Sequence, residues 1–364
     1  MTGLFIKTRE RLILLKRVIN RKGIGNTMAK IGIVGAGSWG IALAMLLYNN
    51  GHKVSVWSAL GDEIDMLNAE HEHKDKLPGV QLPMDMIFTK ELAEVTADKD
   101  IIVLAVPSSF TRATANSMNA YIKEGQIIVN VAKGIEESTL MTLSQVIEDE
   151  LPQANVAVLS GPSHAEEVGR GIPTTIVVGA NTRETAEFIQ NVFMSDVFRV
   201  YISPDVLGIE LGAALKNVVA LAAGIADGLG YGDNTKAALI TRGMTEIARL
   251  GMAMGGKFET FCGLSGIGDL IVTCASMHSR NRRAGILIGK GKTMEEAMAE
   301  VKMVVEGVFS AKAAMGLAKK YNVELPIIEQ VNEVLFNGKS AAMAVTDLMI
   351  RDKKIEAFND TDWK

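Results

Sequence analysis

A lysine and an asparagine, Lys216 and Asn217, stand inside an otherwise apolar stretch of the sequence. Burying an ammonium group is costly unless the group is paired or functional. A desolvated lysine has a lowered pKa and can move a proton near neutral pH, as the interconversion of an alcohol and a ketone requires. Lys216 is therefore a candidate catalytic residue. The alternative is a structural ion pair with Glu210 or another carboxylate.

A second group of candidates follows strand-like sequence. Lys133, next to Gly134, comes just after one apolar run, and the segment 160–165 (Ser-Gly-Pro-Ser-His-Ala) ends another. Ligands bind open α/β sheets at the carboxyl ends of the strands, and helix N-termini there favour anions. Lys133 is interpreted either as an anion contact or as a solvated surface lysine.

Donors that suit a phosphate are concentrated in residues 263–283. Ser279, Arg280 and Asn281 combine a hydroxyl, a guanidinium and an amide at a predicted helix start, and the planar fork of arginine matches a phosphate dianion. Asp269, which follows a glycine-rich run, is a candidate for setting the protonation or orientation of Lys216. The adjacent Arg282 is equally compatible with a solvated basic face.

A glycine-rich turn after the first predicted strand indicates a cofactor site. Gly35, Gly37 and Gly40 form a G-x-G-x-x-G motif between an apolar strand and a helix. Such glycines permit a tight turn, approach of the backbone to a pyrophosphate, and close helix packing. The motif predicts a nicotinamide dinucleotide; a packing turn is the alternative. The ribose-binding acid expected about 20 residues later is missing at Ser58, so NAD and NADP both stay open.

Alternating strands and helices must carry these residues. Between Lys30 and Tyr201, short β-rich runs alternate with helical periodicity, which predicts an α/β domain with a doubly wound, mainly parallel sheet. After Pro204 the strand signal ends, and helical spacing predicts an all-α domain around a buried central helix at 210–229. The predicted strands are 30–34, 53–57, 101–105, 126–130, 155–160, 174–178 and 198–201.

The chain divides into four expected segments. Residues 1–27 carry seven basic side chains and one acidic one, and we expect a disordered or dispensable extension. Residues 28–204 are the predicted dinucleotide-binding domain, 205–355 the helical substrate and catalytic domain, and 356–364 a tail. The whole chain has a formal net charge of −4, without the uniformly basic character of most nucleic-acid binders. No nucleic-acid partner is expected.

Composition favours a soluble cytoplasmic protein. Uninterrupted apolar runs such as 101–106 and 218–226 are far shorter than the roughly 20 residues of a membrane-spanning helix, so no integral membrane association is expected. Two cysteines and 19 methionines suit a reducing compartment. Residues 70–73 contain two histidines, but they lack a further ligand cluster and are interpreted as a solvated loop. No metal site is expected.

These motifs together resemble the bacterial NAD(P)-dependent sn-glycerol-3-phosphate dehydrogenase family over residues 28–350. The resemblance implies a Rossmann-type domain joined to an all-helical domain, with cofactor and substrate in the cleft between them. It also implies a cytoplasmic homodimer that supplies glycerol 3-phosphate for glycerophospholipid synthesis. The residues that carry it are 35–40, 77–83, 133–134, 161–165, 215–218, 266–270 and 279–282.

By this resemblance, Lys216 accepts the proton when glycerol 3-phosphate is oxidised and donates it when dihydroxyacetone phosphate is reduced, with Lys133 and Asp269 in the same catalytic group. The implied substrate contacts are Lys133, Gly161, Ser163, Lys216, Asn217, Asp269, Ser279, Arg280 and Asn281. The glycine motif and the resemblance together give the cofactor contacts as Gly35, Gly37, Ser38, Trp39, Gly40, Lys133, Ala165, Arg280, Val304 and Glu306.

The residues alone predict a dehydrogenase of a phosphorylated alcohol, because they combine a dinucleotide turn, a lysine base and a phosphate clamp. Only the resemblance specifies glycerol 3-phosphate. Two alternatives stay open at this point: another lysine-based dehydrogenase of a β-hydroxyacid or sugar acid, and a dinucleotide-binding sensor without turnover.

Overall fold

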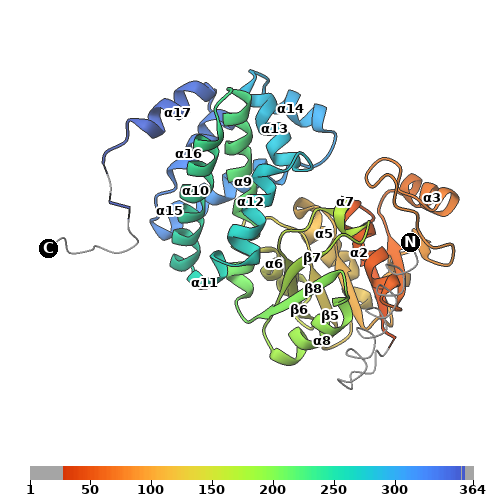
Figure 1. Cartoon of the computed structure of the whole chain (residues 1–364). Coiled ribbons are helices and arrows are strands. Elements are labelled where there is room, and N and C mark those ends of the chain that lie inside the picture. The colour runs from red at the N-terminus through yellow and green to blue at the C-terminus, as the bar shows by residue number, and fades with distance from the viewer. Residues whose placement is uncertain (1–27, 354, 357–364) are drawn as a thin grey trace, which may run out of the picture.

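The computed structural model describes residues 28–353 and 355–356 as two lobes, a sheet with covering helices and a bundle of helices (Figure 1). Residues 1–27, for which we expect a disordered or dispensable extension, lie outside the described residues, as does almost all of the predicted tail. The sheet belongs to the first part of the chain, and the helical lobe follows it in sequence.

The sheet has eight strands in the order β3-β2-β1-β4-β5-β6-β7-β8. All neighbouring strands are parallel except β6 and β7, which are antiparallel. The predicted doubly wound, mainly parallel sheet is therefore confirmed. The strands are β1 (Lys30–Val34), β2 (Lys53–Trp57), β3 (Ile87–Thr89), β4 (Ile101–Leu104), β5 (Ile127–Asn130), β6 (Asn155–Ser160), β7 (Thr174–Ala180) and β8 (Phe198–Ser203).

Strand β3 is the one element of this sheet that the sequence prediction lacked. It is a three-residue edge strand, too short to show the alternation by which a half-buried strand is recognised. The predicted bounds of β1, β2 and β6 agree with the structure, while β7 and β8 run on to Ala180 and Ser203.

Helices cover both faces of the sheet because successive side chains of its strands point to opposite sides. Ile33 is buried against one set of helices, in a core with Ile41 of α2 and Ile189 of α8. Val34 is buried on the other face, in a core with Ala115 of α5 and Ile147 of α6. The covering helices are α2 (Ser38–Asn49), α3 (Gly61–Glu70), α4 (Leu92–Thr96), α5 (Thr111–Met118), α6 (Leu143–Glu150), α7 (Ala165–Val168) and α8 (Arg183–Phe193).

The second lobe is built around α9 (Val206–Gly228), which confirms the predicted central helix. Helices α10, α12, α13 and α15 pack against it. A Cβ on Gly285 of α13 would lie 2.3 Å from the carbonyl oxygen of Leu221, so only glycine allows this close approach. The other helices are α10 (Asp233–Ala253), α11 (Phe258–Phe261), α12 (Asp269–Ala275), α13 (Arg280–Gly289), α14 (Met294–Val301), α15 (Glu306–Tyr321), α16 (Pro326–Phe336) and α17 (Ala341–Met349).

Two stretches of the described chain, Val206–Gly228 and Phe258–Ala275, are long and apolar enough for a membrane span. The expectation from uninterrupted apolar runs missed α9, because Glu210 and Lys216 interrupt its sequence. The most apolar window of α9 is 89% buried inside the protein, as the core helix of a bundle must be. The second stretch is 39% buried and has non-helical backbone angles at Gly266.

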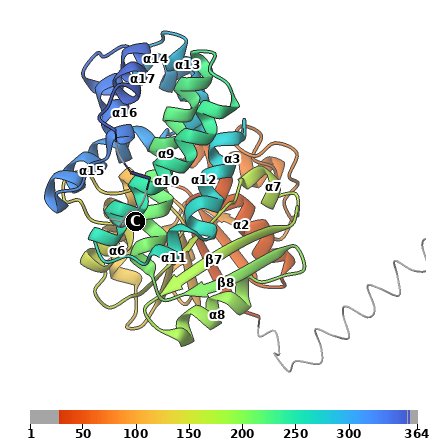
Figure 2. The same ribbon diagram turned by 60° about the vertical axis from the view of Figure 1, so that its left-hand side comes forward.

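One short connection joins the lobes within the described chain, from the end of β8 at Ser203 to the start of α9. Asp205 lies in it, and its carboxylate accepts hydrogen bonds from the backbone N–H groups of Gly208 (3.0 Å) and Lys257 (2.9 Å) and from the Thr260 hydroxyl (2.6 Å). The carboxylate therefore caps α9 and also fixes the chain just before α11. Figure 2 shows α11 beside β7, and α9 contacts β6 and β7 of the sheet.

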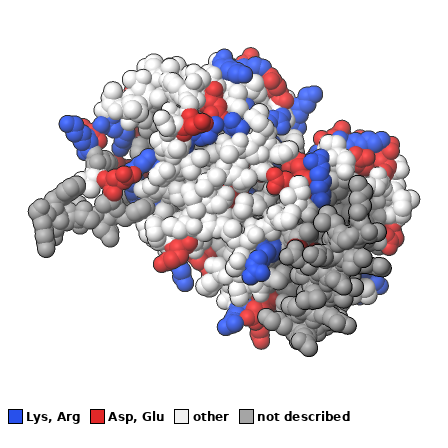
Figure 3. All heavy atoms as spheres, viewed as in Figure 1, with Lys and Arg blue, Asp and Glu red and all other residues white. Residues whose placement is uncertain are grey.

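Charges of both signs are interspersed on the face of the molecule drawn in Figure 3, and a broad central part of that face carries neither sign. Glu246 of α10 is one of the buried carboxylates of the helical lobe, with 4% of its surface exposed. It accepts hydrogen bonds from the backbone N–H groups of Ile327 (2.8 Å) and Ile328 (3.3 Å) at the start of α16. Burial raises the pKa of Glu246 to about 7.

This buried glutamate predicts a specific pH dependence of stability. The pKa is higher in the folded than in the unfolded chain, so the folded state binds more protons between about pH 5 and 7, and its stability falls as pH rises through that range. Glu246→Gln keeps an acceptor but removes the titration. The Tm of the variant relative to wild type should therefore rise from pH 5 to pH 8 in thermal unfolding followed by circular dichroism. The exposed Glu329→Gln is the control, and a pH-independent difference for Glu246→Gln would contradict the prediction.

Candidate active site

The glycine-rich turn lies where the strand order reverses, between β1 and β4, as expected for a ligand site in an open α/β sheet. Gly35 has φ +119°, and a Cβ there would lie 2.8 Å from the backbone of Ala105. A Cβ on Gly40 would lie 2.0 Å from the carbonyl oxygen of Gly35. Gly37 differs, because a Cβ there would meet nothing within 4 Å. Packing thus explains two of the glycines, and the third faces open space.

The residues after this turn present backbone donors to the same space. Helix α2 starts at Ser38, with Gly37 as its N-cap residue, so its first N–H groups have no partner within the helix and favour an anion. Trp39 packs against the core of the sheet domain, and its indole N–H is buried with no hydrogen-bond partner in the described chain. Helix α7, which begins at Ala165, packs against α2. The arrangement fits the pyrophosphate of a dinucleotide.

A carboxylate does lie near the end of β2, although the sequence pattern lacked an acid at that point. Glu63 of α3 accepts a hydrogen bond from the Ser58 hydroxyl and pairs with His73 (2.8 Å) and Lys76. Burial opposes its ionisation, but these three partners lower the pKa of Glu63 to about 2. His73 is 1% exposed, so the interpretation of residues 70–73 as a solvated loop is wrong for this residue.

Two lysines share one buried carboxylate at the junction of the lobes. Lys216 of α9 donates to Oδ1 of Asp269 (2.8 Å), and Lys133, in the connection after β5, donates to Oδ2 (2.7 Å). The side chains of Lys216 and Asp269 are 6% and 2% exposed. The predicted proximity of Asp269 to Lys216 is confirmed. The alternative, an ion pair with Glu210 or another carboxylate, is wrong for Glu210 but agrees with the Lys216–Asp269 pair. Lys133 is not the solvated surface lysine of the other interpretation.

Burial and charge set the protonation of this cluster. Burial is the main reason that the pKa of Lys216 falls to about 8, with Lys133 lowering it further and Asp269 opposing the change. Burial alone disfavours the charged form of Asp269, but Lys133 and Lys216 outweigh it and lower the pKa of that carboxyl. The site therefore holds an ionised aspartate beside a lysine that exchanges protons near neutral pH.

The turn after β6 joins the cluster through Lys133. The Lys133 ammonium donates to the carbonyl oxygen of Gly161 (3.1 Å) and lies 3.5 Å from the Ser163 hydroxyl. Gly161 has φ +146°, a backbone conformation that favours glycine. The carbonyl group that accepts from Lys133 belongs to this residue. His164 follows, and burial, with Lys216 and Lys133 nearby, lowers the pKa of its imidazole.

Thr273 is a site residue that the sequence analysis missed. Its hydroxyl lies 2.5 Å from the Lys216 ammonium and donates to the backbone carbonyl oxygen of Asp269 (2.6 Å). Residues four apart share a face of a helix, so Thr273 and Asp269 both face Lys216 from α12. The four-residue spacing from Asp269 could therefore have indicated Thr273 as a site residue.

The segment predicted to bind phosphate begins α13, as expected. The Ser279 hydroxyl caps this helix by accepting from the backbone N–H of Arg282 (3.2 Å). Asn281 donates to Asn217 of α9 (2.9 Å) and accepts from the backbone N–H of Gly307 (2.9 Å). These bonds tie α9, α13 and α15 together immediately beside Lys216.

The remaining predicted residues lie on the helical side. Burial lowers the pKa of Arg280, and the negative charges of Glu306 and Glu166 oppose that change. Glu306 accepts hydrogen bonds from the Ser108 hydroxyl and from the Ser108 backbone N–H (3.1 Å), which lies just after β4. Burial raises the pKa of Glu306.

Two further predicted residues lie beside these. Val304 is partly buried in the connection before α15. Arg282 is not part of a solvated face, because it pairs with Asp227 at 2.7 Å.

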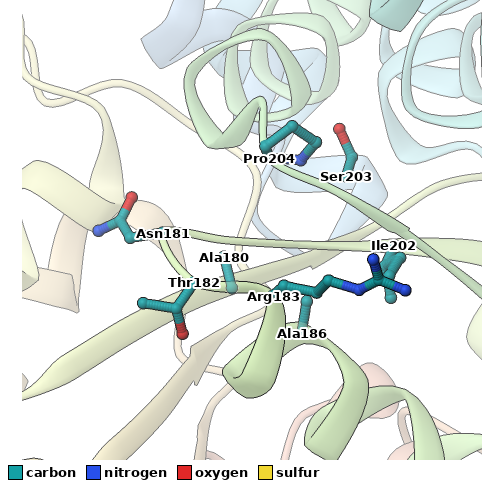
Figure 4. A pocket seen from close by; sticks show the side chains of 8 residues that line it. All are labelled: Ala180, Asn181, Thr182, Arg183, Ala186, Ile202, Ser203 and Pro204. Atoms are coloured by element: carbon teal, nitrogen blue, oxygen red, sulfur yellow. The ribbon is translucent and has the colours of Figure 1, made fainter.

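A separate hollow of about 310 Å³ lies away from this cluster, between β7, α8 and the end of β8. Figure 4 shows Asn181 and Thr182 on one side of it, with Ser203 and Pro204 above. Its lining contains none of the lysine–aspartate residues. Among residues 28–353 and 355–356 there is no group of three or more histidines, cysteines, aspartates or glutamates that could hold a metal ion.

A dinucleotide turn at the point where the strand order reverses, together with a buried lysine–aspartate pair in the helical lobe, is typical of a nicotinamide-dependent dehydrogenase. Residues 30–186 match the N-terminal family of NAD-dependent glycerol-3-phosphate dehydrogenase, and residues 205–346 match its C-terminal family. The chain belongs to the NAD-dependent glycerol-3-phosphate dehydrogenase family.

Relatives agree with this assignment. The chain is 64% identical over 337 residues to glycerol-3-phosphate dehydrogenase [NAD(P)+] of Agathobacter rectalis, covering 93% of this chain and 100% of the relative. It is 51% identical over 332 residues to the Bacillus subtilis protein of that name, covering 90% and 96%. The crystal structure of glycerol-3-phosphate dehydrogenase from Coxiella burnetii has a TM-score of 0.86 and 36% identity, covering 89% and 99%.

The open space at Gly37 gives a direct test of the dinucleotide site. Gly37 has φ −63°, which any residue adopts, so Gly37→Ala should fold, with Tm lowered only by the small cost of alanine at an N-cap. The added methyl group occupies the space that a pyrophosphate needs, and NADH affinity should fall about tenfold or more. Titration of nicotinamide fluorescence measures the affinity. Gly51→Asn, at an exposed turn, is the control; unchanged NADH binding by Gly37→Ala would place the dinucleotide elsewhere.

Proposed function

We propose that this protein interconverts dihydroxyacetone phosphate and sn-glycerol 3-phosphate, with Lys216 as the group that exchanges the proton. The observation that carries the proposal is the buried Lys216–Asp269–Lys133 cluster at the carboxyl edge of the dinucleotide-binding sheet. The nicotinamide ring, when bound, accepts or supplies the hydride. Physiologically, the product glycerol 3-phosphate serves glycerophospholipid synthesis.

Lys216 is placed for general acid–base work. In the oxidation, the neutral amine of Lys216 would accept the proton of the hydroxyl group on C2 as that carbon loses its hydride. In the reduction, the Lys216 ammonium returns that proton to the carbonyl oxygen. A pKa of about 8 suits both directions, because neither protonation state is rare near neutral pH.

Lys133 and Asp269 support this exchange. Asp269 orients Lys216 and stabilises its ammonium form, while Lys133 adds positive charge where the ketone oxygen becomes negative. Two lysines against one carboxylate leave the cluster with an excess positive charge when both lysines are protonated. That charge favours an anionic substrate over a neutral alcohol.

The substrate phosphate is assigned to the start of α13. Ser279, Arg280 and Asn281 offer a hydroxyl, a guanidinium and an amide there, and the helix N-terminus favours an anion. Asn217, Gly161 and Ser163 are further substrate contacts in this proposal, supported by their positions around the lysine–aspartate cluster.

The dinucleotide is assigned to the glycine-rich turn and its surroundings. Gly35, Gly37, Gly40, Ser38 and Trp39 would hold it from the sheet domain. The remaining proposed contacts come from both lobes, and they are Lys133, Ala165, Arg280, Val304 and Glu306.

The domain division, location and assembly complete the proposal. Residues 28–204 bind the dinucleotide and 205–355 supply most of the catalytic residues, in keeping with the change from sheet to helices between β8 and α9. The protein acts in the cytoplasm as a homodimer, without nucleic acid, membrane or metal. A chain with 19 methionines and two cysteines suits a reducing compartment, which supports this location.

Turnover and its loss at Lys216 test the function. Absorbance at 340 nm should fall when dihydroxyacetone phosphate is added with NADH or NADPH, and Lys216→Ala should lower kcat by about a thousandfold or more because the proton donor is gone. Its NADH affinity should match wild type. The exposed Lys290→Ala is the control. A wild-type protein that binds NADH but reduces only a carboxylate substrate would support the β-hydroxyacid alternative.

The pKa of Lys216 predicts opposite pH trends for the two directions. Oxidation needs the neutral amine, so its kcat should rise as pH increases through about 8; reduction needs the ammonium, so its kcat should fall over the same range. Asp269→Asn removes a charge that raises the Lys216 pKa, and both profiles should then move to lower pH. Profiles that do not move in Asp269→Asn would contradict this role for Lys216.

A further inference from the structure

Another buried glutamate lies on the helix that carries Lys216, and the reaction described above does not use it. Glu210 of α9 is 4% exposed. Its Oε1 atom accepts hydrogen bonds from the side-chain amide of Asn130 (3.1 Å) and from the backbone N–H of Ser144 (2.9 Å). Both partners belong to the sheet domain, so this carboxylate connects the two lobes.

The first partner controls the turn that carries Lys133. Asn130 is the last residue of β5, and its side-chain oxygen accepts from the backbone N–H of Ala132 (3.1 Å). The amide nitrogen of the same side chain donates to Glu210. An Asn130 side chain fixed in this way holds the backbone immediately before Lys133.

The second partner fixes the other end of the same connection. Ser144 lies in the first turn of α6, two residues after the N-cap residue Thr142. A carboxylate at that place satisfies a free N–H group and interacts favourably with the helix dipole. One side chain on α9 therefore holds both ends of the β5–α6 connection, and Lys133 lies between them.

These contacts link Glu210 to Lys216 by two routes, through helix α9 and through Lys133 and Asp269. Lys133 donates to Asp269 (2.7 Å), Asp269 accepts from Lys216 (2.8 Å), and Lys216 is on the same helix as Glu210. We propose that Glu210 is a positioning residue that sets where the Lys133 ammonium stands relative to Asp269 and Lys216. This inference rests on the proposed function of that cluster.

Burial of this carboxylate has a cost that the hydrogen bonds must offset. Burial raises the pKa of Glu210, and the bonds from Ser144 and Asn130 to Oε1 oppose that rise, while Oε2 is buried without a hydrogen-bond partner in the described chain. An apolar side chain of similar size would avoid the desolvation cost, but it would leave the Asn130 amide and the Ser144 N–H unpaired. The connection would then lose its fixed position, and Lys133 would move from Asp269.

Displacement of Lys133 has a measurable electrostatic consequence. The positive charge of Lys133 lowers the pKa of Lys216, whereas Asp269 raises it. When Lys133 no longer neutralises Asp269, the Lys216 pKa must rise. A residue with a merely structural role would not produce this shift.

The experiment compares Glu210→Ala with Glu210→Gln and with a matched control, Glu246→Ala. The control removes another buried glutamate that holds a distant helix start, so it should lower Tm but leave kcat and its pH profile unchanged. Glu210→Ala should lower kcat of glycerol 3-phosphate oxidation by about tenfold or more and move its profile to higher pH. Glu210→Gln, which keeps an acceptor oxygen, should stay within about threefold of wild type. An unmoved profile in Glu210→Ala would overturn the proposal.

A double-mutant cycle tests whether Glu210 acts through Lys133. In a Lys133→Ala background, adding Glu210→Ala should change kcat by less than about twofold, because the residue it positions is already gone. A loss as large as in wild type would overturn the proposal. Should Glu210→Ala fail to fold, Asn130→Ala breaks the same link from the other side and must show the same profile shift and the same non-additivity.

Crystal structures separate this inference from the proposed function. In Glu210→Ala, or in Asn130→Ala, the Lys133 ammonium should leave hydrogen-bond distance of Asp269, and in Glu210→Gln it should stay. A Lys133–Asp269 bond retained in both Glu210→Ala and Asn130→Ala would overturn the positioning role. This readout needs no turnover, so a wild-type protein inactive on dihydroxyacetone phosphate would refute the function and leave the positioning role to be decided by the structures.

Discussion

The whole site depends on a single carboxylate that is buried between two ammonium groups. Asp269 must stay ionised inside the protein, and Lys133 and Lys216 make that possible by outweighing the cost of burial. Neither lysine could be buried there without it. Since Lys133 belongs to the sheet domain and the other two to the helical lobe, the cluster exists only when the lobes are packed together.

Close backbone packing places this carboxylate. A Cβ on Gly266 would lie 2.1 Å from the carbonyl oxygen of Phe261, and a Cβ on Gly212 of α9 would lie 2.8 Å from that of Ser265. The turn before α12 therefore presses directly on α9, and α12 starts with Asp269 opposite Lys216. The glycines around Asp269 allow backbone segments to approach each other closely, whereas a Cβ on Gly37 would meet nothing within 4 Å. Packing therefore explains the glycines around Asp269 but not Gly37.

Features that local pattern determines were predictable from the sequence. Strand alternation and the glycine motif indicated the doubly wound sheet and its dinucleotide turn, and an ammonium in an apolar helix indicated Lys216. The features that were missed depend on contacts between distant segments. The pairing of Glu63 with Ser58, the burial of His73 and the bond from Ser108 to Glu306 join residues that no local spacing relates. Thr273 was within reach of helical spacing, but only the structure shows Lys216 beside it.

The connection at Asp205 has a consequence for where the two lobes can move relative to each other. The three donors to its carboxylate, on Gly208, Lys257 and Thr260, all belong to the helical lobe, so Asp205 is bound into that lobe. A hinge needs residues whose backbone angles change freely. Any change of angle between the lobes at this connection must therefore fall on Ser203 and Pro204, and the proline ring fixes one of those angles.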